Sequence, residues 1–162
     1  MPHTELPRLL DQLERAFHSD AWSGPSLLAT LIGLSAEQAA ARPIPPAHSI
    51  WELVLHLRTW AATASARIEQ RYHVLIEGED WPAVPLVADE VAWQTALAEL
   101  SKAHERLLTA VQALHDKDLN EVLGAERNRP DGSGVSIYVL LHGTAQHYLY
   151  HAGQVALLRK LV

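Results

Sequence analysis

The chain has 162 residues with 13 Lys plus Arg against 19 Asp plus Glu, which gives a formal net charge of −6, and it contains no cysteine. The length suits a single domain over residues 1–162, and the acidic balance without a basic patch argues against a nucleic-acid partner. The missing cysteines exclude a disulfide scaffold and a cysteine nucleophile, so any metal would have nitrogen or oxygen ligands. No apolar run is long enough to cross a bilayer and no signal-peptide pattern is visible, so we expect a cytoplasmic protein with no membrane partner.

The first predicted helix runs from Thr4, its N-cap, to about His18. Its apolar stripe recurs at three- and four-residue steps and consists of Leu6, Leu9, Leu10, Leu13 and Phe17. Residues 19–48 are less regular, although Pro25 can begin a short helix and Ser35 can cap another through Ala41. A crossover of this length allows the first two long helices to be parallel or non-adjacent.

The second long helix is predicted from Ser49 to about Tyr72, because Ser49-Ile-Trp-Glu52 matches a capping box. Its inner face comprises Leu53, His56 or Leu57, Trp60, Ala64 and Ile68, so His56 faces or borders the core. Glu52 lies four residues before His56 and offers an alternative role as a carboxylate that orients the imidazole. The capping box is the commoner role for this residue pattern.

Two further helices follow, separated by irregular segments. Residues 73–88 form an acidic connection around Trp81, and a third helix is predicted from Asp89 to His115. A loop with the turn signal Asp131-Gly132 then precedes a fourth helix capped by Ser136. Four amphipathic helices without strand alternation predict an all-α four-helix bundle.

The fourth helix carries an unusual pair of histidines on its inner face. His147 and His151 are four residues apart, so both imidazoles can reach one point. The alternative is that both are core residues, in which case each needs its own polar partner. If the second and fourth helices adjoin, His56 joins the pair to give a three-histidine metal site with an open fourth position.

Other side chains compete for functional roles. His104 shares the third helix's apolar stripe, which consists of Trp93, Leu97, Leu100, His104, Leu107, Val111 and Leu114. His142 is turned by about 140° from His147 and so points elsewhere. Gln154 can bond a backbone carbonyl or a bound water. The large aromatic residues are more typical of a core than of a substrate wall, namely Trp51, Trp60, Trp93 and Tyr148.

The histidine segments also resemble a known family. Residues 49–56, Ser-Ile-Trp-Glu-Leu-Val-Leu-His, resemble the second-helix motif of the DinB-like family, residues 147–159 resemble its C-terminal motif, and the Asp80-Trp-Pro loop is similar to many members. The resemblance covers nearly the whole chain. It implies an up-down-down-up four-helix bundle with a long helical crossover between helices one and two, and a divalent metal on His56, His147 and His151. The arginine common after the last histidine is Ala152 here.

The resemblance also shapes the expected function, because known relatives include metal-dependent thiol S-transferases and a thiol-dependent isomerase. We therefore expect a metalloenzyme of the thiol S-transferase type that activates a low-molecular-weight thiol against a small-molecule substrate. A metal-dependent hydrolase and a non-catalytic metal- or ligand-binding module are the alternatives. Zinc or nickel is the first choice of ion, and three imidazoles also suit iron or copper. The sequence assigns no catalytic residue.

A homodimer is expected from apolar residues that the bundle stripes do not use. These are Val54, Leu108, Leu140 or Leu141, and Leu157. Surplus apolar positions can form a second, intermolecular face, and a two-fold pair is the commonest closed assembly. The alternative is that the short crossover helices cover these residues within one chain.

Overall fold

The computed structural model describes residues 4–18, 20–76, 78–124 and 134–162. Its elements in chain order are α1 (Glu5–Phe17), β1 (Asp20–Ala21), β2 (Gly24–Pro25), α2 (Leu27–Leu31), α3 (Ala36–Ala40), α4 (Ile50–Gln70), α5 (Glu90–Gln112), the 3₁₀ helix η1 (Asp116–Asn120) and α6 (Ile137–Leu158). The predicted all-α class is confirmed. The predicted turn at Asp131-Gly132 lies outside the described residues.

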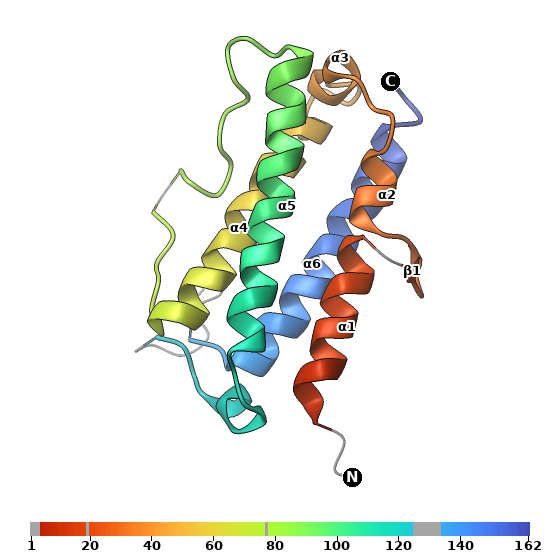
Figure 1. Ribbon diagram of the computed structural model, residues 1–162. Helices are drawn as coiled ribbons and strands as arrows, with labels where there is room; N and C mark the ends of the chain where they lie inside the picture. The colour runs from red at the N-terminus through yellow and green to blue at the C-terminus, as the bar shows by residue number, and fades with distance from the viewer. Residues whose placement is uncertain (1–3, 19, 77, 125–133) are drawn as a thin grey trace.

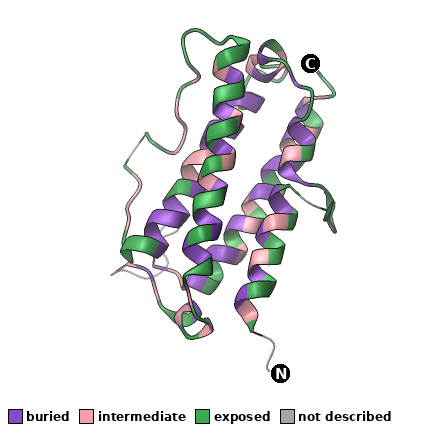
Figure 2. Ribbon diagram, in the orientation of Figure 1, coloured by how far each residue is buried: buried purple, intermediate pink, exposed green. Residues whose placement is uncertain are grey.

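The long helices α1, α4, α5 and α6 pack along one another (Figure 1). α4 contacts α5 and α6, and α1 contacts the same two helices from the other side. In Figure 1, α1 and α6 run upward while α4 and α5 run downward. Figure 2 shows buried residues on the faces that the helices turn toward one another and exposed residues on the outer faces. This arrangement makes α4 and α6 neighbours, which is the condition for His56 to meet His147 and His151.

Helix starts are fixed largely by local capping side chains, as the sequence predicts. The hydroxyl of Ser49 accepts a hydrogen bond from the Glu52 amide at 3.2 Å, and the Glu52 carboxylate accepts one from the Ser49 amide at 2.7 Å. Ser35 caps α3 with a second capping box, and the Ser136 hydroxyl accepts from the Val139 amide at the start of α6. These local bonds satisfy amides that have no partner inside a helix.

The predicted cap of α1 is wrong in its chemistry. Thr4 occupies the N-cap position, but its side chain makes no capping hydrogen bond. The free amides of Glu5 and Leu6 instead donate to the two carboxylate oxygens of Asp116, at 3.0 and 3.1 Å. A carboxylate accepts more strongly than a hydroxyl and also complements the positive end of the helix dipole.

The crossover between α1 and α4 contains more structure than predicted. β1 and β2 pair antiparallel, with Asp20 opposite Pro25. Strands of two residues are too short to produce a visible alternation, so the sequence gives no signal for them. Pro25 therefore ends β2, and Ser26 stands at the N-cap of α2. α2 packs on α6, and α3 packs on α4 and α5, so the crossover covers one end of the long helices.

Most of the surplus apolar residues are accounted for within one chain. Val54, Leu108, Leu140 and Leu141 are all buried, whereas Leu157 is 58 % exposed. Only Leu157 of these residues remains exposed for contact with a second chain, and the homodimer stays a prediction.

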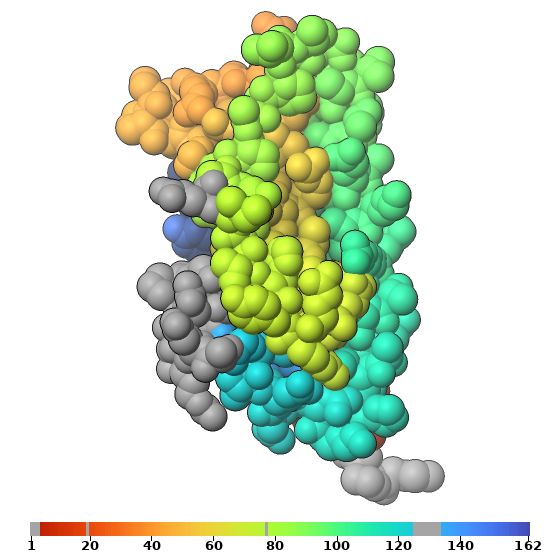
Figure 3. Space-filling view, turned by 90° about the vertical axis from the view of Figure 1, so that its left-hand side faces the viewer, coloured from red at the N-terminus to blue at the C-terminus, as the bar shows by residue number. Residues whose placement is uncertain are grey.

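In the connection from α4 to α5, residues 71–76 and 78–89 lie along the outside of these two helices. Figure 3 shows this segment lying in front of α4 and α5. Residue 77, part of the acidic stretch predicted here, lies outside the described residues. The connection brings Asp80 and Trp81 to the side of α4 that carries His56. Among the described residues, no helix combines the length and apolar character needed to cross a membrane.

Candidate metal centre

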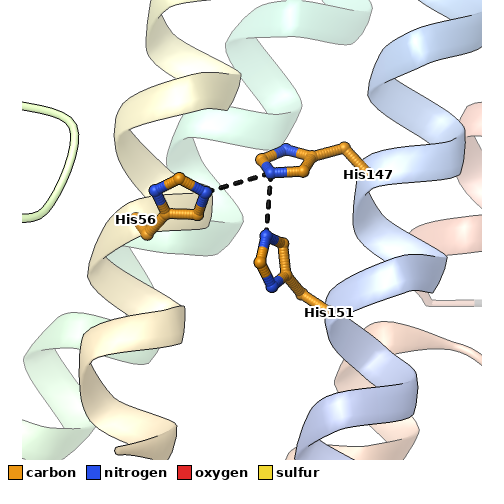
Figure 4. A group of neighbouring side chains, drawn as sticks. All are labelled: His56, His147 and His151. Atoms are coloured by element: carbon orange, nitrogen blue, oxygen red, sulfur yellow. Dashed lines mark hydrogen bonds between the residues drawn. The ribbon is translucent and has the colours of Figure 1, made fainter. Parts of the chain in front are cut away.

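Two neighbouring helices bring the three predicted histidines together (Figure 4). His147 and His151 project from successive turns of α6, and His56 projects toward them from α4. The Nε2 atom of His147 lies 3.0 Å from the Nε2 of His56 and 2.9 Å from the Nε2 of His151. Among the described residues, these three form the group whose ligand atoms lie close enough to hold a metal ion, all within 4.8 Å of one another.

The cluster lies at the inner side of the helices rather than on the surface. His56 and His151 are each 5 % exposed, and His147 is half-buried. Burial lowers the pKa of all three imidazoles, and for His147 the charges of His151 and His56 add to this effect and bring the pKa to about 3. The imidazoles are therefore neutral at pH 7, which is the state that coordinates a metal.

Hydrogen bonds on the far side of two rings fix which nitrogen faces the cluster. The Nδ1 of His56 lies 2.8 Å from the carbonyl oxygen of Asp80 and 3.0 Å from a carboxylate oxygen of the same residue. The Nδ1 of His151 lies 2.7 Å from the Oε1 of Gln154. Because these partners accept hydrogen bonds, each Nδ1 carries the proton and each Nε2 presents a lone pair to the centre.

This donor set fits a cation. The Nε2 atoms of His56 and His151 each present a lone pair to the Nε2 of His147. If that nitrogen carries a proton, its N–H can donate a hydrogen bond to only one of the two, and the other lone pair is left without a donor. A metal ion would attract all three lone pairs at once. A tetrahedral ion with metal–nitrogen distances of about 2.0–2.1 Å has ligand atoms about 3.3 Å apart, so the observed 2.9 and 3.0 Å require only small side-chain shifts.

The connection between α4 and α5 covers one side of the cluster. The indole of Trp81 stacks on the imidazole of His56, with ring centroids 3.9 Å apart and planes at 9°. His48 stacks on Trp81 in turn, at 3.6 Å and 4°. The Trp60 indole N–H donates to the carboxylate of Asp80 at 2.5 Å, so Asp80 links α4 to the connection at two points. These contacts hold the ring of His56 in place.

The competing residues occupy other places. Glu52 serves the capping box and forms an ion pair with Arg42, so the carboxylate that orients His56 is Asp80. His142 adjoins a hollow beside α1 with its ring 4.4 Å from Tyr138, which agrees with the predicted rotation away from His147. His104 is buried against Phe17 and is not part of the three-histidine group.

Of the aromatic residues assigned to the core, Trp51, Trp93 and Tyr148 are fully buried, as predicted. Trp60 is different, because its half-buried ring lines a pocket next to His147. Sequence reasoning placed Gln154 near a carbonyl or a water, whereas it bonds His151. The roles of Asp80 and Trp81 were missed, and their position in a segment similar to the DinB-like family was the one available signal.

The fold and the cluster together define an all-α protein with a candidate three-histidine metal centre. A family model described as the DinB superfamily matches residues 21–155. The chain therefore belongs to the DinB superfamily, which confirms the resemblance of its two histidine segments. Searches of the curated proteins and of the solved structures found no match.

Proposed function

We propose that this chain is a metalloenzyme of the thiol S-transferase type in which His56, His147 and His151 hold a divalent metal. The observation that carries the proposal is the convergence of three Nε2 atoms, two of them on rings whose Nδ1 atoms face acceptors. No fourth His, Asp or Glu of the described residues joins this group, so a position is open for an exchangeable ligand. Membership of the DinB superfamily supports the transferase class.

His56, His147 and His151 would hold the ion, which would lower the pKa of a thiol or water in the open position and so supply a nucleophile at neutral pH. In such a transfer the thiol proton would pass to solvent, the sulfur electron pair would form a bond to carbon of the acceptor, and the leaving group would depart with the electron pair of the broken bond. Asp80 and Gln154 keep the rings of His56 and His151 oriented throughout, and Trp81 shields His56 from solvent.

Elemental analysis tests the metal. The protein is purified without a histidine tag and supplemented in turn with zinc, nickel, iron(II) and copper(II). We expect one ion per chain, with zinc or nickel held most firmly. Protein that retains no ion after any of these supplements would overturn the proposal.

An activity comparison tests the reaction class. Metal-loaded protein is assayed with several low-molecular-weight thiols and a chlorinated aromatic acceptor, and separately with ester substrates. Thioether formation supports the transferase. Ester hydrolysis without a thiol would replace it with the metal-dependent hydrolase, because the same open position can hold a water. Inactivity of the metal-loaded protein in every assay would leave a metal-binding module.

The proposal includes two features of architecture and assembly. The first is the up-down-down-up four-helix bundle, which the helix directions in Figure 1 support. The second is a homodimer, for which exposed Leu157 is the remaining residue from the sequence argument. Light scattering over a dilution series distinguishes a dimer from a single chain of 17.9 kDa.

A further inference from the structure

An apolar pocket lies between α4 and α6, next to the histidine cluster. Its volume is about 320 Å³, and it is lined by Trp60, Ala64, Arg67, Val135, Val139, Leu140, Gly143, Thr144 and His147. The imidazole of His147 thus belongs both to the cluster and to the pocket wall. The indole of Trp60 forms another part of the wall, and its ring lies 5.9 Å from that of His147.

The pocket follows from small residues on the faces that α4 and α6 turn toward each other. On α4, His56, Trp60 and Ala64 are spaced four residues apart, so they form one row that leads away from the cluster. On α6, Gly143 and His147 continue the row of His151 in the same way. A Cβ atom built on Gly143 would meet no atom within 4 Å. Small side chains therefore leave the space that Trp60 and His147 border.

Two polar side chains of this wall already bond within the protein. The hydroxyl of Thr144 donates to the carbonyl of Leu140 at 2.8 Å within its own helix, so its methyl group is left for the pocket. Arg67 is buried, donates from Nε to the carbonyl of His73, and lies with its guanidinium carbon 5.6 Å from the centre of the Trp60 ring. Apolar and aromatic surface thus dominates the wall, which is the usual character of a small-molecule site.

We propose that this pocket binds a small uncharged aromatic molecule of one or two rings. Size supports this class, because a cavity of about 150 Å³ already accommodates benzene and this pocket has about twice that volume. The Trp60 indole contributes aromatic surface to the pocket wall, and aromatic rings pack favourably against one another. The assignment of the pocket as the acceptor side of the metal centre rests on the proposed function, whereas binding itself does not.

Gly143→Leu tests the pocket without replacing any histidine of the cluster. A side chain added there enters open space, and leucine is a better helix former than glycine, so the variant keeps α6 intact. Gly153→Leu is the matched control, because Gly153 lies on the same helix with nothing within 4 Å of a Cβ and is not part of the pocket wall. Thermal unfolding of both variants checks that they fold.

The probe is 2-naphthol, titrated into metal-free protein by calorimetry. Methyl resonances of Val139 and Leu140 are followed by NMR, since a bound ring shifts the signals of methyl groups beside it. We expect wild type and Gly153→Leu to bind 2-naphthol with the same affinity. Gly143→Leu should bind it at least tenfold more weakly, because the leucine side chain occupies apolar surface that the ring would otherwise bury. Equal binding by Gly143→Leu, or unshifted Val139 and Leu140 methyl signals, would overturn the inference.

A second measurement places the probe relative to the centre. With cobalt(II) loaded, the protons of bound 2-naphthol should relax faster than with zinc, because the pocket shares His147 with the cluster. Protein that retains a metal but fails to bind 2-naphthol would overturn this inference alone. Protein that binds 2-naphthol but retains no metal would overturn the proposed function alone.

Discussion

Among the described residues, buried histidines occur in two regions of this helical protein, and their surroundings differ. His104 of α5 is 2 % exposed and stacks on Phe17 with ring centroids 3.8 Å apart and planes at 7°. Its Nδ1 lies 3.3 Å from the Tyr148 hydroxyl, and its Nε2 has no hydrogen-bond partner among the described residues. In the cluster, by contrast, the Nε2 atoms of His56 and His151 both approach the Nε2 of His147.

Burial and a lowered pKa are common to both regions. Desolvation brings the pKa of His104 to about 3, with a smaller contribution from the charge of His18, and the pKa of His147 also falls to about 3. What distinguishes the cluster is convergence of nitrogen lone pairs together with acceptors behind the rings. A buried imidazole in an apolar stripe is therefore weak grounds for a ligand, whereas imidazoles that share one point are strong grounds.

Removing a ligand should have the largest effect. We expect His56→Ala, His147→Ala and His151→Ala each to weaken metal binding by more than about 100-fold. Loss of the group that hydrogen-bonds a ligating histidine already costs about 10- to 100-fold in affinity, and loss of the histidine itself should cost more. Competition with a chelator measures the affinities. His104→Ala and His142→Ala are the controls and should bind like wild type. A His104 variant that loses the metal while the His56 variant keeps it would show the ligand set to be wrong.

Acid unfolding of the metal-free protein tests the His104 region, because it measures how protonation of this histidine affects stability. His104 stays neutral in the folded chain down to about pH 3, whereas an unfolded histidine takes up a proton below about pH 6.5. The unfolded state therefore binds more protons in this interval, and stability falls as the pH falls. From pH 6.5 to pH 5 this histidine alone should lower the unfolding free energy by about 1.6 kcal/mol.

His104→Phe should remove that contribution, so its unfolding free energy should depend less steeply on pH than that of wild type. Urea titrations at several pH values between 5 and 7 give the slopes. Tyr148→Phe is the matched control, because it removes the hydroxyl partner while leaving the imidazole to titrate. An unchanged slope in His104→Phe would mean that protonation of this ring does not contribute to acid unfolding.

Asp80→Ala should weaken metal binding by about tenfold, because it removes a carboxylate that orients His56 while the backbone carbonyl remains. Glu79→Ala controls for a loss of charge at the neighbouring position, since Glu79 bonds the Ile76 amide and does not touch the histidines. The same chelator competition serves here. Equal losses in the two variants would attribute the effect to charge rather than to orientation.

Trp81→Leu should have the smallest effect, about three- to tenfold on metal affinity, because a stacked aromatic pair contributes about 0.5–1.5 kcal/mol beyond its buried area. Trp22→Leu is the control, since Trp22 is fully exposed. If Trp81→Leu binds metal as tightly as wild type, the stack covers His56 without stabilising its position.

Local chemistry explains which features could be predicted from the sequence. The starts of α4 and α6 follow from Ser49 and Ser136, whose caps involve residues three positions away. The shared face of His147 and His151 follows from helical periodicity alone. That His56 lies near His147 and His151 could be predicted only on the condition that α4 and α6 pack together, because no local sequence pattern shows which helices are neighbours.

Features that depend on distant contacts could not be predicted. Asp80 lies 24 residues from His56 in an irregular segment, and Asp116 lies 111 residues from the amide of Glu5 that it binds. No helical or strand periodicity predicts the position of a side chain in an irregular segment. Only the packing of the whole fold brings Asp80 to His56 and Asp116 to the start of α1. For the same reason no local pattern indicates the pocket, whose wall comes from α4, from α6 and from Val135.

The stack of Trp81 on His56 has a spectroscopic consequence. The Trp81 ring centroid lies 3.9 Å from that of His56, so an open-shell ion held at the proposed site would be close enough to quench the indole emission. Nickel, iron(II) and copper(II) have partly filled d shells, whereas zinc is d¹⁰ and leaves the emission largely intact. Comparing wild type with Trp81→Leu isolates this indole from the other tryptophans. The intrinsic fluorescence of the protein thereby separates zinc from the open-shell candidates without a label.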